Sequence, residues 1–141
     1  MKEKCILFDF DGTLCNLDHR LHLVKDKNKF HVQCDKDKPD FTIINLCKTL
    51  SLRYKIVIAS CRPKLVEEKS KEWLKKYNVP YDDFILREDD DKRPDDVIKL
   101  DFIKQIQEKY DIECAIDDRD KVVKMFRENG IKCLQVNYGD F

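Results

Sequence analysis

The sequence has few glycines, and this scarcity excludes one common class of phosphate site. Its 141 residues include only Gly12, Gly130 and Gly139. A P-loop needs two glycines five residues apart, followed by a lysine and a serine or threonine, and no such pair is present. We therefore expect no P-loop kinase site in these residues.

An excess of charge of either sign is also missing. Lysine plus arginine number 28, and aspartate plus glutamate number 28, so no net positive field favours binding to nucleic acid. Any such contact must come from a local patch. The opening residues Met1–Lys4 lead into only a short apolar run, so we expect neither a signal peptide nor a membrane span.

The seven cysteines form no C-x-x-C pair, and most of them lie in apolar segments, namely Cys5, Cys47, Cys114 and Cys133. This pattern is typical of small buried side chains in a reducing compartment. We therefore expect a cytoplasmic protein without a zinc site.

The order of apolar segments predicts an α/β fold. Short apolar runs favour strands, and helical spacing favours helices. The expected strands are 5–8, 54–60, 84–86, 112–117 and 131–136, and the expected helices are about 39–52, 63–78, 95–110 and 121–129. This alternation indicates a Rossmann-like three-layer sandwich with a central, mostly parallel sheet. We expect one domain, 1–141, with a small insert or minimal cap at about 16–38.

Two aspartates follow the first apolar run, in the segment CILFDFDGTLC from Cys5 to Cys15. On an extended chain that rises about 3.3 Å per residue, Asp9 and Asp11 point to the same side and Phe10 points away. Like charges this close are costly unless one is protonated or a cation such as Mg²⁺ lies between them. A solvated Asp-x-Asp-Gly turn is the alternative, but it does not explain so apolar an approach.

Other polar side chains occur where later strands end. Ser60 and Arg62 follow the second predicted strand, and Asp117, Asp118 and Arg119 follow the fourth. The carboxyl ends of parallel strands meet at one edge, where the ligands of open α/β sheets bind. We therefore expect these side chains to gather with the two aspartates of the first strand.

Lys99 extends the apolar stripe of the helix predicted at 95–110, and Asp95 lies one turn earlier on the same side. By itself this lysine would be interpreted as a residue whose aliphatic stem covers the core. Together with the acidic strand ends, it is a candidate for neutralising a phosphate or the aspartate that attacks it.

These residues resemble the four motifs of the haloacid dehalogenase superfamily of phosphotransferases. The matching positions are DFDGT at 9–13, Ser60 after an apolar strand, Lys99 at a helix start and AIDD at 115–118. The resemblance spans nearly the whole chain and implies the haloacid dehalogenase-like fold.

A closer likeness is to the 3′-phosphatase domain of phage-type polynucleotide kinase-phosphatases. It rests on 115–141, on RPDDVIK at 93–99 and on Arg20, eleven residues after the first aspartate. The chain departs from this family at Cys61, where glycine is common, and over 16–37.

The resemblance implies an Mg²⁺-dependent reaction through an aspartyl-phosphate. Asp9 would attack phosphorus, and Asp11 would protonate the leaving oxygen and then deprotonate the hydrolytic water. The metal ligands would be Asp9, the Asp11 backbone carbonyl and Asp118. Asp117 would be either a ligand or an acceptor behind the ligands.

The resemblance also implies a set of residues that bind and position the substrate. Lys99 and the Ser60 hydroxyl would neutralise and orient the phosphoryl group. Asp95 would orient Lys99 or an arginine. The remaining candidates for contacts with substrate phosphates are Arg20, Arg62, Arg119 and Thr13.

The insert offers a candidate nucleic-acid patch, made of Arg20, Lys25, Lys27, Lys29 and Phe30. It would supply cations for phosphates and one aromatic face for a base. The alternative is a hydrated lysine-rich loop. The histidines His19, His22 and His31 are expected to be solvated or at the substrate's edge, and Glu88–Asp91 to be a solvated loop.

The expected substrate is a DNA or RNA end that carries a 3′-phosphate. A phosphatase for small phosphomonoesters, such as nucleotides or sugar phosphates, shares every catalytic residue and stays an alternative. A non-enzymatic phosphoryl-receiver domain is disfavoured, because Asp11 supplies the acid/base that makes turnover fast. No membrane partner is expected, and a separate kinase or ligase partner is left open.

Overall fold

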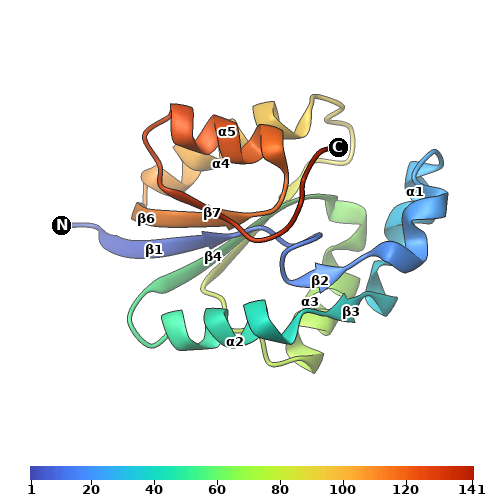
Figure 1. Ribbon diagram of the computed structural model, residues 1–141, viewed down its shortest axis with the longest axis horizontal. Helices are drawn as coiled ribbons and strands as arrows, with labels where there is room; N and C mark the ends of the chain where they lie inside the picture. The colour runs from blue at the N-terminus through green and yellow to red at the C-terminus, as the bar shows by residue number, and fades with distance from the viewer.

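The computed structural model describes residues 1–141 and contains a central sheet of five strands. The strands are β1 (Glu3–Phe8), β4 (Lys55–Pro63), β5 (Asp83–Arg87), β6 (Tyr110–Asp117) and β7 (Cys133–Gln135), in the order β5-β4-β1-β6-β7. Every neighbouring pair is parallel. The predicted parallel α/β sheet is therefore confirmed (Figure 1).

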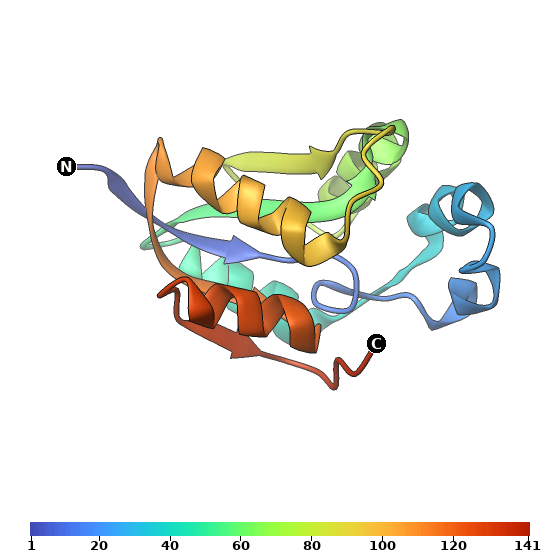
Figure 2. The same ribbon diagram turned by 90° about the horizontal axis from the view of Figure 1, so that it is seen from above.

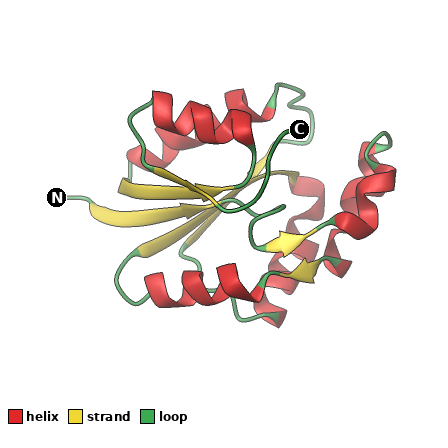
Figure 3. Cartoon of the chain, in the orientation of Figure 1, coloured by secondary structure: helices red, strands yellow, loops and turns green.

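Two pairs of helices cover the two faces of the sheet (Figures 1 and 3). Helices α2 (Phe41–Leu50) and α3 (Glu67–Lys76) lie on one face, and α4 (Asp95–Gln107) and α5 (Asp120–Glu128) lie on the other. In β1, Cys5 and Leu7 belong to the core under α4 and α5, whereas Ile6 and Phe8 belong to the core under α2 and α3. This double burial is the reason that β1 is a continuous apolar run.

The segment between β1 and α2 forms a small insert beyond the carboxyl edge of the sheet (Figure 2). Its two short strands, β2 (Cys15–Asn16) and β3 (Lys38–Pro39), pair antiparallel. Between them lie the 3₁₀ helix η1 (Asp18–Leu23), the helix α1 (Lys27–Val32) and the 3₁₀ turn η2 (Cys34–Lys36). Asp26 caps α1 by accepting a hydrogen bond from the Lys29 amide.

Pro63 differs from its predicted role as the first residue of a helix. Its backbone is still extended, with ψ 154°, so it ends β4, and the 3₁₀ turn η3 (Lys64–Val66) precedes α3. Gly130 follows α5 with φ +77°, as expected of a glycine that ends a helix.

All seven cysteines are unpaired, and no helix is long and apolar enough to cross a membrane.

Candidate active site

A tight loop after β1 presents the two aspartates. The Asp9 amide donates to Ile116 O in β6 at 3.0 Å, so the chain is hydrogen-bonded to the sheet up to this residue. The Leu14 amide then donates to Phe10 O at 2.9 Å, which closes the turn. Gly12 has φ +80°, and a Cβ at this position would lie 2.1 Å from Asp118 Oδ2. The loop therefore requires glycine both for its backbone conformation and for the close approach of Asp118.

A first group of charged side chains, here called the carboxylate cluster, consists of Asp9, Asp117, Asp118 and Lys99. Lys99 Nζ donates to Asp9 Oδ1 and to Asp117 Oδ2, both at 2.7 Å. All four side chains are buried. Lys99 thus reaches the sheet edge from α4 and ties the end of β1 to the end of β6.

The electrostatics of this cluster show a surplus of negative charge. Burial raises the pKa of Asp9 well above its usual value and Asp117 raises it further, whereas Lys99 lowers it. Burial also raises the pKa of Asp118 to about 6. Although burial lowers the pKa of Lys99, Asp117 and Asp9 outweigh this and keep the ammonium charged. One ammonium therefore faces three carboxylates.

These residues fit a divalent metal. Carboxylate oxygens of Asp9, Asp117 and Asp118 lie within 4.8 Å of one another, and an all-oxygen donor set is what Mg²⁺ prefers. Asp117 already accepts the amides of Asp118 and Arg119 on Oδ1, at 2.8 and 3.1 Å, and Lys99 on Oδ2. Asp118, by contrast, has only the Thr13 hydroxyl at 3.4 Å as a side-chain donor. Asp118 Oδ2 thus has no protein donor, and Asp9 Oδ2 has only the same Thr13 hydroxyl, at 3.3 Å, so these two oxygens are the ones most available for an ion.

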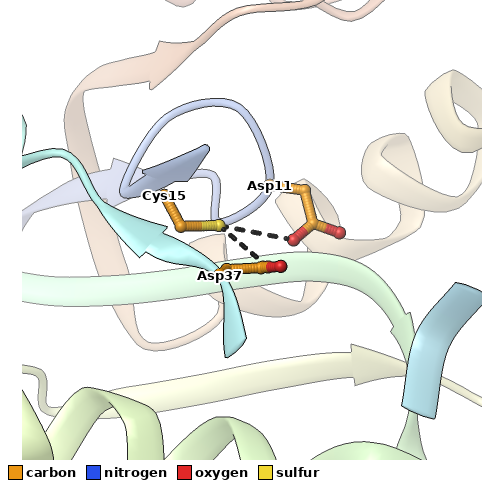
Figure 4. Close-up of side chains that lie close together, drawn as sticks. All are labelled: Asp11, Cys15 and Asp37. Atoms are coloured by element: carbon orange, nitrogen blue, oxygen red, sulfur yellow. Dashed lines mark hydrogen bonds between the residues drawn. The ribbon is translucent and has the colours of Figure 1, made fainter. Parts of the chain in front are cut away.

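A second group, here called the arginine cluster, consists of Asp11, Asp37, Arg20 and Arg62. Arg62 donates to Asp11 Oδ1 through Nε and Nη2, at 2.9 and 2.7 Å, and Arg20 Nη2 donates to the same oxygen at 2.9 Å. Asp37 accepts from Arg20 Nε and Nη2 at 2.8 Å and from Arg62 Nη2 at 3.0 Å. The Cys15 thiol lies between the two aspartates, 3.7 Å from Asp11 Oδ1 and 3.3 Å from Asp37 Oδ2 (Figure 4).

Asp11 is the solvent-accessible member of the arginine cluster. Its side chain is 25% exposed, whereas those of Asp37, Arg20 and Arg62 are 0% exposed. Burial opposes ionisation of Asp11, but Arg62 and Arg20 outweigh it and hold the pKa of Asp11 well below its usual value. In this arrangement Asp11 is a carboxylate that can accept a proton, and it needs a change in its arginine contacts to donate one.

Asp37 is a central residue of the site that the sequence does not reveal. It belongs to the insert, within the polar stretch DKDKPD, where nothing in the sequence separates it from Asp35 or Asp40. In the structure it is 2% exposed, and its backbone carbonyl accepts from Trp73 Nε1 at 2.9 Å. The insert therefore supplies part of the site's internal support.

The other predicted site residues lie around the two clusters. The Ser60 hydroxyl accepts from the Arg62 amide at 3.1 Å, and the Thr13 hydroxyl lies 3.3 Å from Asp9 Oδ2. Asp95 binds arginines and not Lys99: Arg119 Nη1 donates to it at 2.8 Å, and Arg87 Nη2 donates to its other oxygen. Of the two roles expected for Asp95, the structure thus shows the contact with arginine.

The prediction of an exposed basic patch in the insert is wrong for two of its residues, Arg20 and Phe30, which are buried. Arg20 is 0% exposed, and Phe30, at 8%, packs under its guanidinium with 4.3 Å from Cζ to the ring centroid. Only the three lysines of that patch remain on the surface. Phe30 therefore has no free face for a base.

The histidines of the insert are expected to be solvated or at the substrate's edge, and of the three only His31 is partly buried; His19 is exposed but has a partner in the arginine cluster. His19 Nε2 lies 2.6 Å from Asp37 Oδ1, which joins η1 to the arginine cluster. His31 Nδ1 is buried without a hydrogen-bond partner. His22 is exposed, as expected. The Glu88–Asp91 loop is largely exposed as well, but Asp89 Oδ1 accepts the Leu65 amide at 2.9 Å and so fixes the loop to η3.

Fold and site together define a haloacid dehalogenase-like phosphatase. A haloacid dehalogenase-like hydrolase from Streptococcus pneumoniae shares the fold, with a TM-score of 0.64 and 16% identity over 96% of this chain and 85% of that chain. Residues 3–141 match the model of the polynucleotide kinase PNKP phosphatase domain, and the chain belongs to this family. It is therefore a phosphomonoesterase domain, as predicted.

Two solved structures are much more similar in sequence. A chain of the Pnkp1/Rnl/Hen1 RNA repair complex has 35% identity and a TM-score of 0.89, over 99% of this chain and 44% of that chain. A chain in a second structure of the Pnkp1/Rnl/Hen1 complex has 34% identity and a TM-score of 0.86, over 99% and 48%. The present chain thus spans less than half the length of these relatives.

Proposed function

We propose that this domain removes 3′-phosphates from DNA or RNA ends, in an Mg²⁺-dependent reaction that passes through an aspartyl-phosphate on Asp9. The observation that carries the proposal is the carboxylate cluster, in which Lys99 Nζ lies 2.7 Å from both Asp9 and Asp117 at the carboxyl edge of the sheet. The substrate class is supported by the match of residues 3–141 to a polynucleotide kinase phosphatase domain.

Asp9 is the nucleophile in this proposal. One of its carboxylate oxygens forms a bond to phosphorus while the bond from phosphorus to the 3′-oxygen breaks, and water later cleaves the aspartyl-phosphate. Lys99 binds Oδ1, so it lowers the pKa of Asp9 and favours the ionised form that attacks. Lys99 offsets only part of the effect of burial, Asp117 and Asp118, which keep the pKa of Asp9 above its usual value.

Asp11 moves the protons of the two steps. It gives one proton to the departing 3′-oxygen and takes one from the hydrolytic water. The arginine cluster favours the second task, because Arg20 and Arg62 keep Asp11 ionised. We infer that a bound phosphate competes for the same arginine donors, which weakens their hold on Asp11 and raises its pKa for the first task.

Asp9, Asp118 and the backbone carbonyl of Asp11 would hold Mg²⁺, and Asp117 would orient Asp118 and Lys99 from behind. When bound, the ion neutralises negative charge on the phosphoryl oxygens and on the carboxylates that surround them. The support for this assignment is that both oxygens of Asp117 already accept protein donors, whereas Asp118 Oδ2 accepts none.

Phosphate binding falls to side chains whose own positions are well fixed. Arg62 stacks on Phe10, with 3.6 Å from Cζ to the ring centroid, and donates to Ser70 Oγ at 2.9 Å. Such support holds a guanidinium in one orientation for bidentate contacts. In our proposal Arg20 and Arg62 bind the substrate phosphate, with Ser60 and Thr13 beside it, and Arg119 contacts the next phosphate.

A comparison of four substrates tests the assignment. We expect kcat/KM to be highest for a 3′-phosphorylated oligonucleotide, compared with its 5′-phosphorylated counterpart, a 3′-mononucleotide and a sugar phosphate. Preference for the sugar phosphate or the 5′-end would contradict the nucleic-acid assignment and leave the aspartate chemistry standing. A burst of one phosphate per protein without turnover would instead indicate a phosphoryl receiver.

We further propose that the domain acts next to other nucleic-acid repair activities, including a kinase or ligase. The support is that the similar chain was solved within an RNA repair complex named Pnkp1/Rnl/Hen1 and is more than twice as long as the matched region. On this proposal, the isolated domain removes the phosphate without a partner, whereas processing of a broken strand to a sealed product requires one.

A further inference from the structure

We propose that Tyr138 is a stacking platform for the base of the nucleotide that carries the 3′-phosphate. This inference rests on the proposed function, because it assigns a base-binding residue to the same site. Tyr138 follows β7 and has a relative exposure of 103%, so its ring is free on both faces. Every base has a π-face, and stacking on an aromatic side chain is a common way to bind single strands.

Both neighbours of Tyr138 are bound to residues at the active site, Asn137 through its side chain and Gly139 through its backbone. Asn137 Nδ2 donates to Gly12 O at 2.7 Å, in the loop after β1 that carries Asp9 and Asp11. Gly139 O accepts the Asp120 amide at 2.9 Å, and a Cβ on Gly139 would lie 1.8 Å from Asp118 O. Tyr138 is therefore held between Gly12 and Asp118.

The path of the chain agrees with this placement. The Val136 amide donates to Asp117 O at 3.1 Å, and Gln135 Nε2 donates to Asp118 O at 3.0 Å. Figures 1 and 2 both show the C-terminal segment, in red, running alongside the loop after β1 at the carboxyl edge of the sheet. Consecutive Cα atoms are about 3.8 Å apart. Tyr138 is therefore close to both loops, because its neighbours Asn137 and Gly139 contact Gly12 and Asp118.

The other exposed aromatic side chains are already in contact with a partner. Phe41 packs on Tyr77 with ring centroids 6.0 Å apart, and Tyr81 packs on Phe84 at 5.9 Å. Phe141 lies under the Arg119 guanidinium at 5.0 Å. Because Phe30 is buried under Arg20, Tyr138 is the exposed aromatic residue at the site whose ring has no partner.

Single exposed aromatic residues are common on protein surfaces. The test must therefore distinguish a tyrosine that stacks on the base from one that is exposed but does not contact the substrate. We would measure kcat/KM for two oligonucleotides with a 3′-phosphate, one complete and one whose terminal nucleotide lacks its base. The proteins would be the wild type, Tyr138→Ala, Tyr138→Phe and the control Leu52→Ala. Leu52 is 87% exposed and lies just before β4, at the opposite edge of the sheet.

For the complete strand, we expect Tyr138→Ala to lower kcat/KM about 5- to 150-fold, mainly through KM, which corresponds to about 1–3 kcal/mol of stacking. Tyr138→Phe, which keeps the ring, and Leu52→Ala should stay close to the wild type. For the strand without the terminal base, the wild type should lose a similar factor, and Tyr138→Ala should cause no further loss. All variants should unfold at the wild-type temperature.

Two results overturn the stacking proposal while the proposed function stands: an unchanged kcat/KM in Tyr138→Ala, or an equal loss on both strands. Failure of the proposed function is distinguishable, because the wild type would then have a higher kcat/KM for the 5′-phosphorylated strand or the sugar phosphate than for the complete 3′-phosphorylated strand. In that case the base assignment fails together with it.

Discussion

Asp9 and Asp11 are two residues apart, yet their carboxylates lie in opposite electrostatic surroundings. Asp9 shares Lys99 with Asp117, and the charges of Asp117 and Asp118 together with burial raise its pKa. Asp11 is bound by two arginines, which lower its pKa. Pairs of carboxylates with such divergent environments are how one site assigns different chemical tasks to the same functional group.

Replacing each aspartate with asparagine should separate these tasks. Asp9→Asn removes the acceptor of the phosphoryl group, so turnover of an aryl phosphate should fall to background. Asp11→Asn should lower turnover about 10²- to 10⁴-fold and, with a good leaving group, allow a slowly hydrolysed phosphoprotein to accumulate. Intact-mass measurement of the quenched reaction detects that species. Full activity in Asp9→Asn would contradict the mechanism.

The stability of these two variants should also differ. The sequence places both aspartates at an exposed strand end, which predicts little effect on folding. In the structure, however, Asp11 accepts three hydrogen bonds from buried arginines. Asp11→Asn should therefore destabilise the protein, whereas Asp9→Asn relieves repulsion among neighbouring carboxylates and should not. Chemical denaturation of both variants measures this difference.

Gly12 and Gly130 form a matched pair for a second prediction. Both have positive φ, +80° and +77°, but a Cβ would lie 2.1 Å from Asp118 Oδ2 at Gly12 and would meet nothing within 4 Å at Gly130. Gly130→Ala should cost about 1 kcal/mol of stability, from backbone strain, and keep full activity. Gly12→Ala should displace Asp118, raise the Mg²⁺ concentration needed for half-maximal activity and lower kcat. Equal activities of the two variants would contradict the role given to Gly12.

At the scale of elements, the sheet and its four covering helices follow directly from the sequence. β1 is buried on both faces, so its apolar run identifies a central strand, and the polar residues at the carboxyl ends of β1, β4 and β6 then share one edge. The apolar stripe of α4 predicts that Lys99 points toward that edge. Regular periodicity and the geometry of parallel sheets are sufficient for these conclusions.

The insert could not be derived in the same way, because it has no period that a short sequence window reveals. Asp37 looks like any surface aspartate, and its burial results from a tertiary arrangement in which two arginines surround it. The sequence predicts that Phe30 offers an aromatic face to a base, but the guanidinium of Arg20 covers it. Contacts between charged groups that are far apart in the sequence determine the structure of the insert, and local propensity contains no information on such contacts.

His31, at the end of α1, should make the stability of the insert depend on pH. Burial lowers the pKa of His31 to about 4, with Arg20, Lys27 and Arg62 adding to the effect and Asp11 opposing it. Between about pH 4 and the ordinary value of 6.5, the unfolded chain binds a proton that the folded protein does not. Stability should therefore be complete above pH 6.5 and decline as the pH falls toward 4, by at most about 3 kcal/mol because the ring is partly exposed.

The variant His31→Phe tests this dependence. It keeps the ring that packs edge-on against Phe30 at 5.1 Å, and it removes both the titration and the unpartnered Nδ1. Urea unfolding between pH 4 and 7 should show a flatter profile than the wild type, with a gain in stability at the acid end. His22→Gln, at an exposed position, should leave the profile unchanged. An unaltered slope in His31→Phe would refute the assignment.

At the scale of the whole molecule, zero net charge conceals a strong local separation. The arginine cluster pairs two arginines with two aspartates, so it is balanced internally. The carboxylate cluster pairs three aspartates with one lysine and is not. Repulsion in the second cluster opposes folding, since the same aspartates are far apart and solvated in the unfolded chain. The active site is therefore a place where this fold is intrinsically destabilised.

Mg²⁺ should relieve this destabilisation and thus raise the unfolding temperature of the entire chain. An ion that binds only the folded state adds about 2.7 kcal/mol at a concentration one hundred times its Kd, which corresponds to a shift of about 5 to 10 °C for a chain of this size.

The effect of Asp118→Asn on the unfolding temperature should depend on whether Mg²⁺ is present. Without metal the variant should unfold at a higher temperature than the wild type, because one of three crowded carboxylates is gone, and with Mg²⁺ it should lose most of the upward shift. Asp111→Asn, at the exposed opposite end of β6, should retain the wild-type response. Thermal unfolding with EDTA and with increasing Mg²⁺ measures all three proteins, and a full Mg²⁺ shift in Asp118→Asn would show that the ion binds elsewhere.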